Sequence, residues 1–232
     1  MGHKIRPDSM RIGIIENWRS RGLSLKNMPE RLVEDELIRK IIRKQILQAG
    51  VDSIEIERTN NVCRILIKAQ KPGIIIGRGG KGIEDLHLLV NKAIFKLRRE
   101  KYKNKKMEPL AINLNVEEVK KNDVSASIVA QNMATDLEKR LPTRQVMRRS
   151  LDMIMQYKEV RGAKILLSGR LDGAEIARNN RLMKGALPLQ NLRAKIDYGT
   201  ATAFTVYGTV GIKIWIYKGE VFDDNLKLKN KG

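Results

Sequence analysis

The chain has 232 residues, enough for one large domain or for two small ones with separate cores. Its 46 Lys and Arg exceed its 26 Asp and Glu, so the net charge is +20 and the pI is near 10.2. This balance favours a polyanionic partner, with nucleic acid the first choice and an anionic membrane the second. No apolar stretch reaches the roughly 20 residues of a membrane-spanning helix, and the start lacks the apolar core of a signal peptide, so we expect a cytoplasmic protein.

The sequence offers few residues for a metal site, a disulfide or a cofactor. Cys63 is the single cysteine, which excludes an intramolecular disulfide, and we expect it to be a small buried side chain in a strand. His3 and His87 lie far apart, and neither has a neighbour at metal-ligand spacing. We therefore predict no cofactor, no metal site and no catalytic residue.

Residues 1–28 are basic and show little hydrophobic periodicity. We expect them to form an arm that gains order on a partner. Their positive charges outnumber the two acids Asp8 and Glu16 in the same stretch. The basic residues considered are Lys4, Arg6, Arg11, Arg19, Arg21 and Lys26.

Residues 29–118 alternate between helix and strand patterns. Apolar residues at intervals of three and four predict an amphipathic helix that begins near Pro29 and ends at Gly50. Period-two alternation in SIEIER and VCRILIKA then predicts a hairpin around Asn60 and Asn61. A short apolar helix, a glycine loop, a second helix and the strand LAINLNV complete this unit, whose sheet is expected to have three strands.

Residues 119–222 are expected to form a second α+β domain. Two helix patterns cover about 123–141 and 143–157, separated by Pro142. The segments AKILLSG, NLRAKIDYG, TAFTVYG and VGIKIWIYK then predict a four-stranded, mainly antiparallel sheet against those two helices. Residues 223–232 form a polar tail that we expect to be flexible.

The glycine loop fits two phosphate-binding patterns. Gly77, Gly79 and Gly82 spell GxGxxG, but a dinucleotide site needs these glycines directly between a strand and a helix. Here PGIII separates the strand from the glycines, and Glu100, at the offset of a ribose-binding acid, lies in a charged helix end. A P-loop is excluded because Lys81 is followed by glycine rather than by Ser or Thr.

The second pattern is the GxxG loop of KH domains, formed by Gly77, Arg78, Gly79 and Gly80. A short helix precedes it, and a second helix follows whose N-terminal N–H groups can face phosphate. Glycine allows the RNA backbone to approach closely, while Arg78 and Lys81 supply positive charge. A glycine turn that only joins two helices is the remaining alternative.

Two basic surfaces lie outside the loop. The charged run from Lys96 to Lys106 is expected to contact phosphate, although such runs commonly form a solvated face. Arg144 and Arg148 lie one helical turn apart and share a face, for which exposure without a ligand is the alternative. The aromatic residues Phe204, Tyr207, Trp215 and Tyr217 are expected to be sheet residues rather than base stackers.

Five segments resemble successive signatures of the bacterial-type family of small ribosomal subunit protein three. They are MGHKIRPDSMRIGI, PGIIIGRGGKGIEDL, SGRLDGAEIAR, LRAKIDYG and YGTVGIKIWIYKGE, and they follow the family order to about residue 222. SGRLDGAEIAR is specific, whereas the glycine loop alone is not. The chain departs from the family pattern in RNNRLMKGAL, between Arg178 and Pro188, and at Gln145, where a further arginine is usual.

The resemblance implies an α+β protein with a type II KH domain followed by a C-terminal α+β domain. It implies a structural protein of the small-subunit head that binds rRNA and mRNA, not an enzyme, with proteins ten and fourteen as neighbours. It also implies a place beside the channel through which mRNA enters, near proteins four and five. A free KH regulator of mRNA is the alternative function, and an NAD-dependent enzyme is a third.

The predicted RNA-binding residues fall into four groups. They are Gly77, Arg78, Gly79, Gly80 and Lys81 in the loop; Arg98, Arg99, Lys101 and Lys103 in the basic run; Arg144, Arg148 and Arg149 in the C-terminal helix; and, as the resemblance implies, Arg170 and Arg178 in the SGRLDGAEIAR signature.

Overall fold

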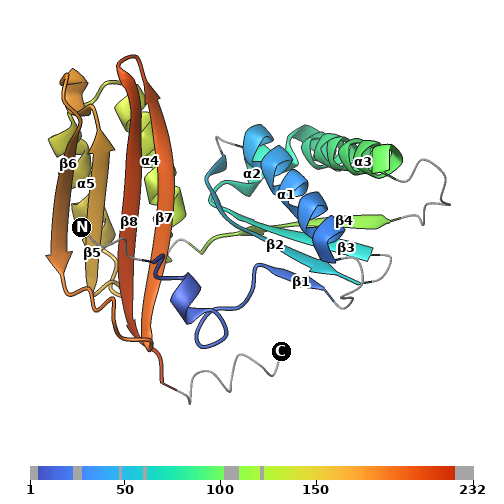
Figure 1. Cartoon of the computed structure of the whole chain (residues 1–232), viewed down its shortest axis with the longest axis horizontal. Helices are drawn as coiled ribbons and strands as arrows, with labels where there is room; N and C mark the ends of the chain where they lie inside the picture. Colours follow the sequence, from blue (N-terminus) through green and yellow to red (C-terminus); the bar gives the residue numbers. More distant parts are fainter. Residues whose placement is uncertain are drawn as a thin grey trace. The chain divides into compact units, whose positions relative to one another are not determined.

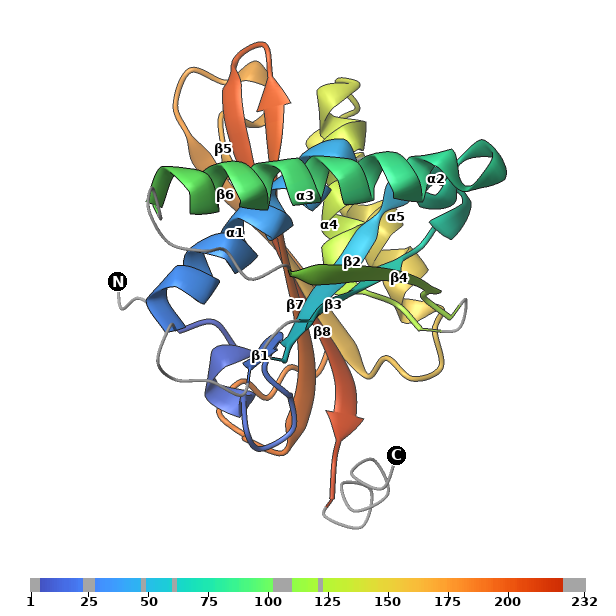
Figure 2. The ribbon, with the colours of Figure 1, turned by 90° about the vertical axis from the view of Figure 1, so that its right-hand side faces the viewer.

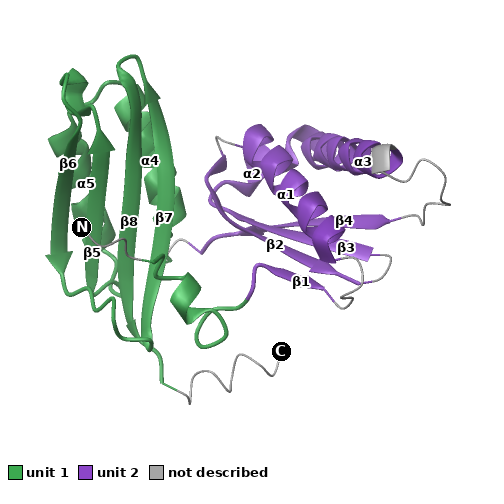
Figure 3. Cartoon of the chain, in the orientation of Figure 1, with its two compact units in different colours: residues 1–17, 121–232 green, residues 18–120 purple. Residues whose placement is uncertain are grey.

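The computed structural model describes residues 5–22, 28–46, 49–59, 62–101, 110–120 and 123–222, without the side chains of Glu100 and Lys101. These residues form two compact units (Figure 3). One lies within residues 18–120, and the other combines residues 1–17 with residues 121–232. The predicted tail, 223–232, lies outside the described residues. Among the described helices, none is long and apolar enough to cross a membrane.

The first unit consists of a four-stranded sheet and the helices that cover it. Its elements are β1 (Ser20–Gly22), α1 (Met28–Gln45), β2 (Val51–Arg58), β3 (Val62–Ala69), α2 (Pro72–Ile76), α3 (Lys81–Lys101) and β4 (Ala111–Glu118). The strand order is β1-β2-β3-β4, with β2 and β3 antiparallel and the two outer pairs parallel. α1 and α3 pack on each other over one face of the sheet (Figure 2).

Alternation along the strands builds the core of this unit. The buried residues of β2 and β3 alternate and face the helices, and all of them except Val51 at the bulge and Arg58 fall into the apolar rows Ile54, Ile56, Cys63, Ile65, Ile67 and Ala69. Cys63 is fully buried in this core, as predicted, and burial raises the pKa of its thiol. The buried strand and helix residues include Ile54, Ile56, Ile65, Ile67, Ile38, Ile42, Val90 and Ile94.

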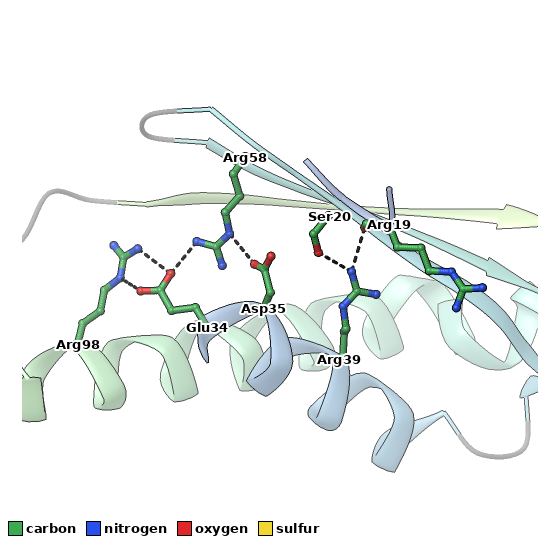
Figure 4. A network of polar contacts seen from close by, with 7 residues as sticks. All are labelled: Arg19, Ser20, Glu34, Asp35, Arg39, Arg58 and Arg98. Atoms are coloured by element: carbon green, nitrogen blue, oxygen red, sulfur yellow. Dashed lines mark hydrogen bonds and ion pairs between the residues drawn. The ribbon is translucent and has the colours of Figure 1, made fainter. Parts of the chain in front are cut away.

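The fourth strand comes from the segment predicted to be an arm. β1 pairs in parallel with β2, from Ser20 opposite Ile56 to Gly22 opposite Arg58. Arg39 of α1 fastens it: its guanidinium donates to the hydroxyl of Ser20 at 2.7 Å and to the carbonyl oxygen of Arg19 at 2.9 Å (Figure 4). An edge strand presents unpaired backbone groups, and three residues are enough to satisfy part of that edge.

The second unit is a sheet covered on one face by two α-helices (Figure 1). Its elements are α4 (Ala126–Glu138), α5 (Thr143–Met155), β5 (Gly162–Gly169), β6 (Arg178–Gly185), β7 (Ala194–Thr205) and β8 (Gly208–Glu220). The strand order is β6-β5-β8-β7, and all three pairs are antiparallel. Val210, Ile212, Ile214 and Ile216 alternate into its core, as predicted. Both units have the predicted α+β class.

The second sheet has four strands, as predicted, but two of them differ from the prediction. β6 was not predicted, because its sequence RNNRLMKG has a polar edge-strand composition without an alternating apolar signal. The predicted strands NLRAKIDYG and TAFTVYG form one strand, β7. β7 runs without a break through Gly199, which the sequence suggested as the end of a strand. That glycine allows close packing instead, because a Cβ there would lie 2.3 Å from the carbonyl carbon of Ala126 in α4.

The described N-terminal residues, 5–17, pack on the second unit rather than forming a free arm. Arg11, in the short 3-10 helix η1 (Ser9–Arg11), is fully buried. Its guanidinium donates to the carbonyl oxygens of Pro7 at 2.6 Å, Leu189 at 3.0 Å and Asn191 at 2.8 Å. Burial lowers the pKa of Arg11, and the three carbonyls accept hydrogen bonds from a residue that the sequence analysis placed in an arm ordered by a partner.

Candidate RNA-binding site

The glycine loop joins two helices. α2 ends at Gly77, and one turn of 3-10 helix, η3 (Arg78–Gly80), leads directly into α3 at Lys81. Arg78, Gly79 and Lys81 are exposed. A dinucleotide loop follows a strand, so this geometry excludes the GxGxxG reading and matches the GxxG one.

Glycine is required in this segment for more than one physical reason. Gly77, Gly79 and Gly80 have φ values of +69°, +63° and +83°, which glycine adopts without strain. A Cβ at Gly79 or Gly80 would meet no atom within 4 Å, so the space outside their backbone is open to a ligand. A Cβ at Gly82 would lie 2.5 Å from the carbonyl oxygen of Ile75, so Gly82 allows α2 and α3 to touch.

An open groove of about 570 Å³ begins one turn beyond the loop, between α3 and the edge strand β4. Ile83 and Leu88 give it an apolar floor, while Asn113 and Asn115 bring amide groups to its rim. Unstacked bases are bound in such places by apolar contact and by hydrogen bonds to their edges. Loop and groove together can hold a nucleotide chain by its backbone and its bases. The lining residues are Ile83, Glu84, His87 and Leu88 of α3 and residues 112–115 of β4.

His87 connects the two walls of the groove. Its Nε2 lies 3.0 Å from the carbonyl oxygen of Ile112, which can only accept, so Nε2 carries the proton and donates. Nδ1 then accepts from the side-chain amide of Asn91 at 3.2 Å. His87 therefore positions β4 against α3, a role consistent with its predicted lack of catalytic function.

The basic run at the end of α3 divides into different environments. Arg98 points into the unit, where Nε lies 2.6 Å from Oε1 of Glu34 and Nη2 lies 3.0 Å from Oε2 (Figure 4). One edge of the guanidinium, formed by Nε and Nη2, is thereby bound to a carboxylate, so a phosphate cannot use that edge. Contact between Arg98 and phosphate stays a prediction. Arg99 is exposed. The side chain of Lys101 and all of Lys103 lie outside the described residues.

Glu34 is the centre of a buried charge network that holds α1, α3 and β2 together (Figure 4). Arg58 donates from Nη1 to Oε2 of Glu34 and from Nε to Oδ1 of Asp35, both at 2.6 Å. Burial by itself would raise the pKa of Glu34, but hydrogen bonds and charge from Arg98 and Arg58 outweigh it, so the pKa is lowered. The helix that carries the loop is thereby fixed to the sheet through Arg98.

The second candidate surface is one face of α5. Arg144, Arg148 and Arg149 are exposed on this helix, and Gln145 is exposed next to Arg144. Buried Val146, Met147, Ser150, Leu151 and Ile154 fix the opposite face in the core. Asp152 follows one turn after Arg148, and Lys184 of β6 pairs with it at 3.1 Å. Positive charge therefore dominates the first two turns of this face.

A residue that the sequence analysis missed fixes the start of α5. Asp172, in the 3-10 turn η4 (Leu171–Gly173), accepts from the backbone N–H of Thr143 at 3.0 Å and from its hydroxyl at 2.8 Å. It thus satisfies a helix N-terminus that Pro142 cannot cap. Its φ of +53° fits the short turn before a glycine, a signal present in the letters LDG.

The two signature arginines have separate environments. Arg170 is half-buried and donates to the carbonyl oxygens of Ala174 at 2.9 Å and Tyr207 at 3.2 Å, so it organises the turn that carries Asp172. Arg178 is exposed at the start of β6. Among the described residues, no group of three or more His, Cys, Asp or Glu could hold a metal ion.

Known families match both units of the chain. The family model of the KH domain matches residues 37–124, which contain the loop, the groove and the two arginines of the charge network, Arg58 and Arg98. The family model of the C-terminal domain of ribosomal protein S3 matches residues 133–216, which contain α5 and most of the sheet of the second unit.

Individual relatives match over nearly the whole length. Small ribosomal subunit protein uS3 of Clostridium novyi (strain NT) is 43% identical over 222 residues, 95% of this chain and 94% of that protein. That of Clostridium botulinum (strain Okra / Type B1) is 41% identical over 232 residues, 100% of this chain and 98% of that protein. That of Finegoldia magna is 41% identical over 222 residues, 95% and 85% of the two chains. The chain therefore belongs to the small ribosomal subunit protein uS3 family, as a structural, RNA-binding protein of the ribosome rather than an enzyme.

Proposed function

We propose that this protein is a constituent of the small-subunit head, in cytoplasmic ribosomes, where it binds rRNA and lines the channel through which mRNA enters. The observation that carries the proposal is that the exposed GxxG loop leads directly into α3, whose first two turns line the groove beside β4. The loop offers backbone N–H groups and positive charge to phosphate, and the groove offers apolar and amide contacts to bases. A net charge of +20 supports binding to a polyanion.

The arginine face of α5 supports a role on incoming mRNA. Each guanidinium of Arg144 and Arg148 can hold phosphate oxygens with two parallel hydrogen bonds. A flexible single strand can bend to meet both arginines, whereas a duplex holds its phosphates in fixed positions. Preference for the opened strand shifts the equilibrium toward it without ATP, because a ligand favours the state to which it binds better. The protein would therefore assist the unwinding of mRNA passively, by binding the opened strand.

The proposed protein neighbours follow from the same placement. They are proteins ten and fourteen in the head and proteins four and five at the mRNA channel. The competing function, a free KH regulator of mRNA, predicts release from small subunits in high salt. A constituent of the subunit stays bound, so sedimentation of subunits after a high-salt wash separates the two functions.

The test of the channel role is the double variant Arg144→Ala/Arg148→Ala. We expect it to assemble into small subunits and to slow translation through a stable mRNA hairpin several-fold more than translation of unstructured message. Gln145 is uncharged, so no arginine at that position compensates for the loss. Lys139→Ala/Lys158→Ala, which removes two other exposed cations of the same unit, is the matched control. Equal slowing on both messages, or no slowing on either, removes these arginines from the mechanism.

A further inference from the structure

Each of the two sheets has one face that its helices do not cover, and the two faces differ in charge. In the first unit, that face mixes three glutamates with three cations: Glu55, Glu57, Glu117, Arg21, Arg64 and Lys68. In the second unit, the three middle rows of residues hold three cations and no acid. The cations are Lys164, Arg181 and Lys213.

Strand register places these residues in rows across β6, β5, β8 and β7. The rows are Asn179, Ser168, Gly211 and Thr202; Arg181, Leu166, Lys213 and Thr200; and Met183, Lys164, Trp215 and Tyr198. The residues that alternate with them, such as Ile165 and Ile214, lie in the core under the helices. The cations therefore share the open face, and Arg181 and Lys213 are exposed on it.

The spacing of the three cations indicates an extended anion. Arg181 and Lys213 stand two strands apart, about 10 Å at a strand spacing of about 4.8 Å. Lys164 is one strand and two residues away from each, which gives about 8 Å by the same geometry. These separations between backbone positions suit a chain in which negative charge repeats.

One end of the face is already occupied within the unit. Arg6 lies over the ring of Tyr198 at 5.5 Å, and Lys164 lies over the ring of Trp215 at 5.2 Å. The two ring centroids are 5.4 Å apart and the ring planes are tilted by 46°, so the rings form a contacting pair with one cation over each ring. The packed N-terminal segment ends the open area there, and the rows through Thr200 and Thr202, both exposed, continue it.

We propose that this open face, Lys164, Arg181 and Lys213 with the hydroxyls around them, is a third RNA-binding surface that binds the phosphate backbone. It rests on the proposed rRNA-binding function and adds a contact separate from the GxxG loop and the α5 arginines. Ser168, Thr200 and Thr202 provide hydroxyl groups for phosphate oxygens and 2′-OH groups between the cations. A protein partner fits less well, because protein interfaces are poor in lysine and two of the three cations are lysines.

The test compares two triple variants of the full chain by the salt dependence of binding to a transcript of the small-subunit rRNA head domain. Lys164→Gln/Arg181→Gln/Lys213→Gln removes the cations of the open face. Lys40→Gln/Lys44→Gln/Arg64→Gln removes three exposed cations of the first unit and serves as the control. We expect the slope of log affinity against log salt to become shallower by about 2 to 3 in the first variant and by less than about 1 in the control.

Two further variants keep the test decisive. Lys164→Arg/Arg181→Lys/Lys213→Arg conserves the charges and is expected to keep the wild-type slope. Repeating the measurements in chains that also carry Arg78→Asp/Gly79→Asp separates this surface from the loop. Removal of the three cations is expected to lower the salt slope by the same amount whether or not the loop binds RNA. An unchanged slope in the folded triple variant, an equal loss in the control, or a loss in the conserving variant overturns the proposal. If the triple variant keeps the wild-type slope but fails to assemble into the small subunit, the open face binds a protein instead of RNA.

Discussion

Glu34 is a nearly fully buried carboxylate that accepts hydrogen bonds from two arginines, and its protonation is coupled to folding. Its pKa is lowered in the folded state. Its contribution to stability is therefore present above its unfolded pKa, near 4.5, and is lost as the pH falls through the lower folded pKa.

Replacing Glu34 with Gln is expected to lower the free energy of unfolding by about 3–5 kcal/mol at pH 7, since Arg58 and Arg98 lose a buried counterion. Below about pH 4.5 the gap between variant and wild type should narrow, because the wild-type carboxylate itself becomes protonated. Urea unfolding between pH 3.5 and pH 7 measures both effects. A gap that stays constant across this range contradicts the proposed role of the carboxylate.

Gly82 is a helical glycine whose replacement by alanine is expected to destabilise the protein. Alanine normally stabilises a helix by about 1 kcal/mol relative to glycine. Here the new Cβ would lie 2.5 Å from the carbonyl oxygen of Ile75, so α2 must move, at a cost of about 1–3 kcal/mol for overpacking. The measurements are urea unfolding and affinity for single-stranded RNA, and both should fall.

Gly73→Ala is the matched control, because Gly73 lies in α2 and a Cβ there would meet no atom within 4 Å. We expect this variant to be as stable as wild type or more stable, with unchanged RNA affinity. If Gly82→Ala behaves in the same way as Gly73→Ala, close contact between α2 and α3 does not hold the loop in place.

α5 presents its arginines from a fixed position because Asp172 caps its first turn. Asp172→Ala removes two hydrogen bonds to Thr143 and places alanine at a φ of +53°, so we expect a loss of about 2 kcal/mol. Asp172→Asn keeps one acceptor and tolerates this backbone conformation, so less than half of the loss is expected. Thermal unfolding of the two variants measures the difference, and equal losses would show that charge alone matters.

The predictability of the elements depended on whether one face of each was apolar. Apolar residues recur at the period of a helix or a strand in α1, α3, β2, β3 and β8, and the sequence predicted all five elements. β1 and β6 are edge strands with polar residues, stabilised by Arg39 and by pairing to β5, so local periodicity could not reveal them. Gly199 indicated a break, but the tertiary contact with α4 turns it into a packing position.

Across the whole molecule, the site was predictable where it depends on backbone conformation and charge. It was less predictable where it depends on contacts between residues distant in the sequence. The glycines of the loop and the exposed α5 arginines followed from spacing alone. Arg11 was assigned to an arm that gains order on a partner and Arg98 to a phosphate-binding run, yet their guanidinium groups bind carbonyls and a carboxylate of residues distant in the sequence. The groove depends on β4 lying beside α3, which only the fold brings together.

The most direct test of RNA binding through the GxxG loop compares the affinity of the full chain for single-stranded RNA in wild type and in Arg78→Asp/Gly79→Asp. The variant is expected to fold, because both residues are exposed and aspartate tolerates the left-handed backbone at position 79. Lys40→Glu/Gln45→Glu, on exposed positions of α1, changes the net charge by the same amount and is the control. We predict at least a tenfold loss of affinity in the loop variant and a much smaller loss in the control. A folded loop variant that binds RNA as tightly as the control would contradict the assignment of the loop as an RNA clamp.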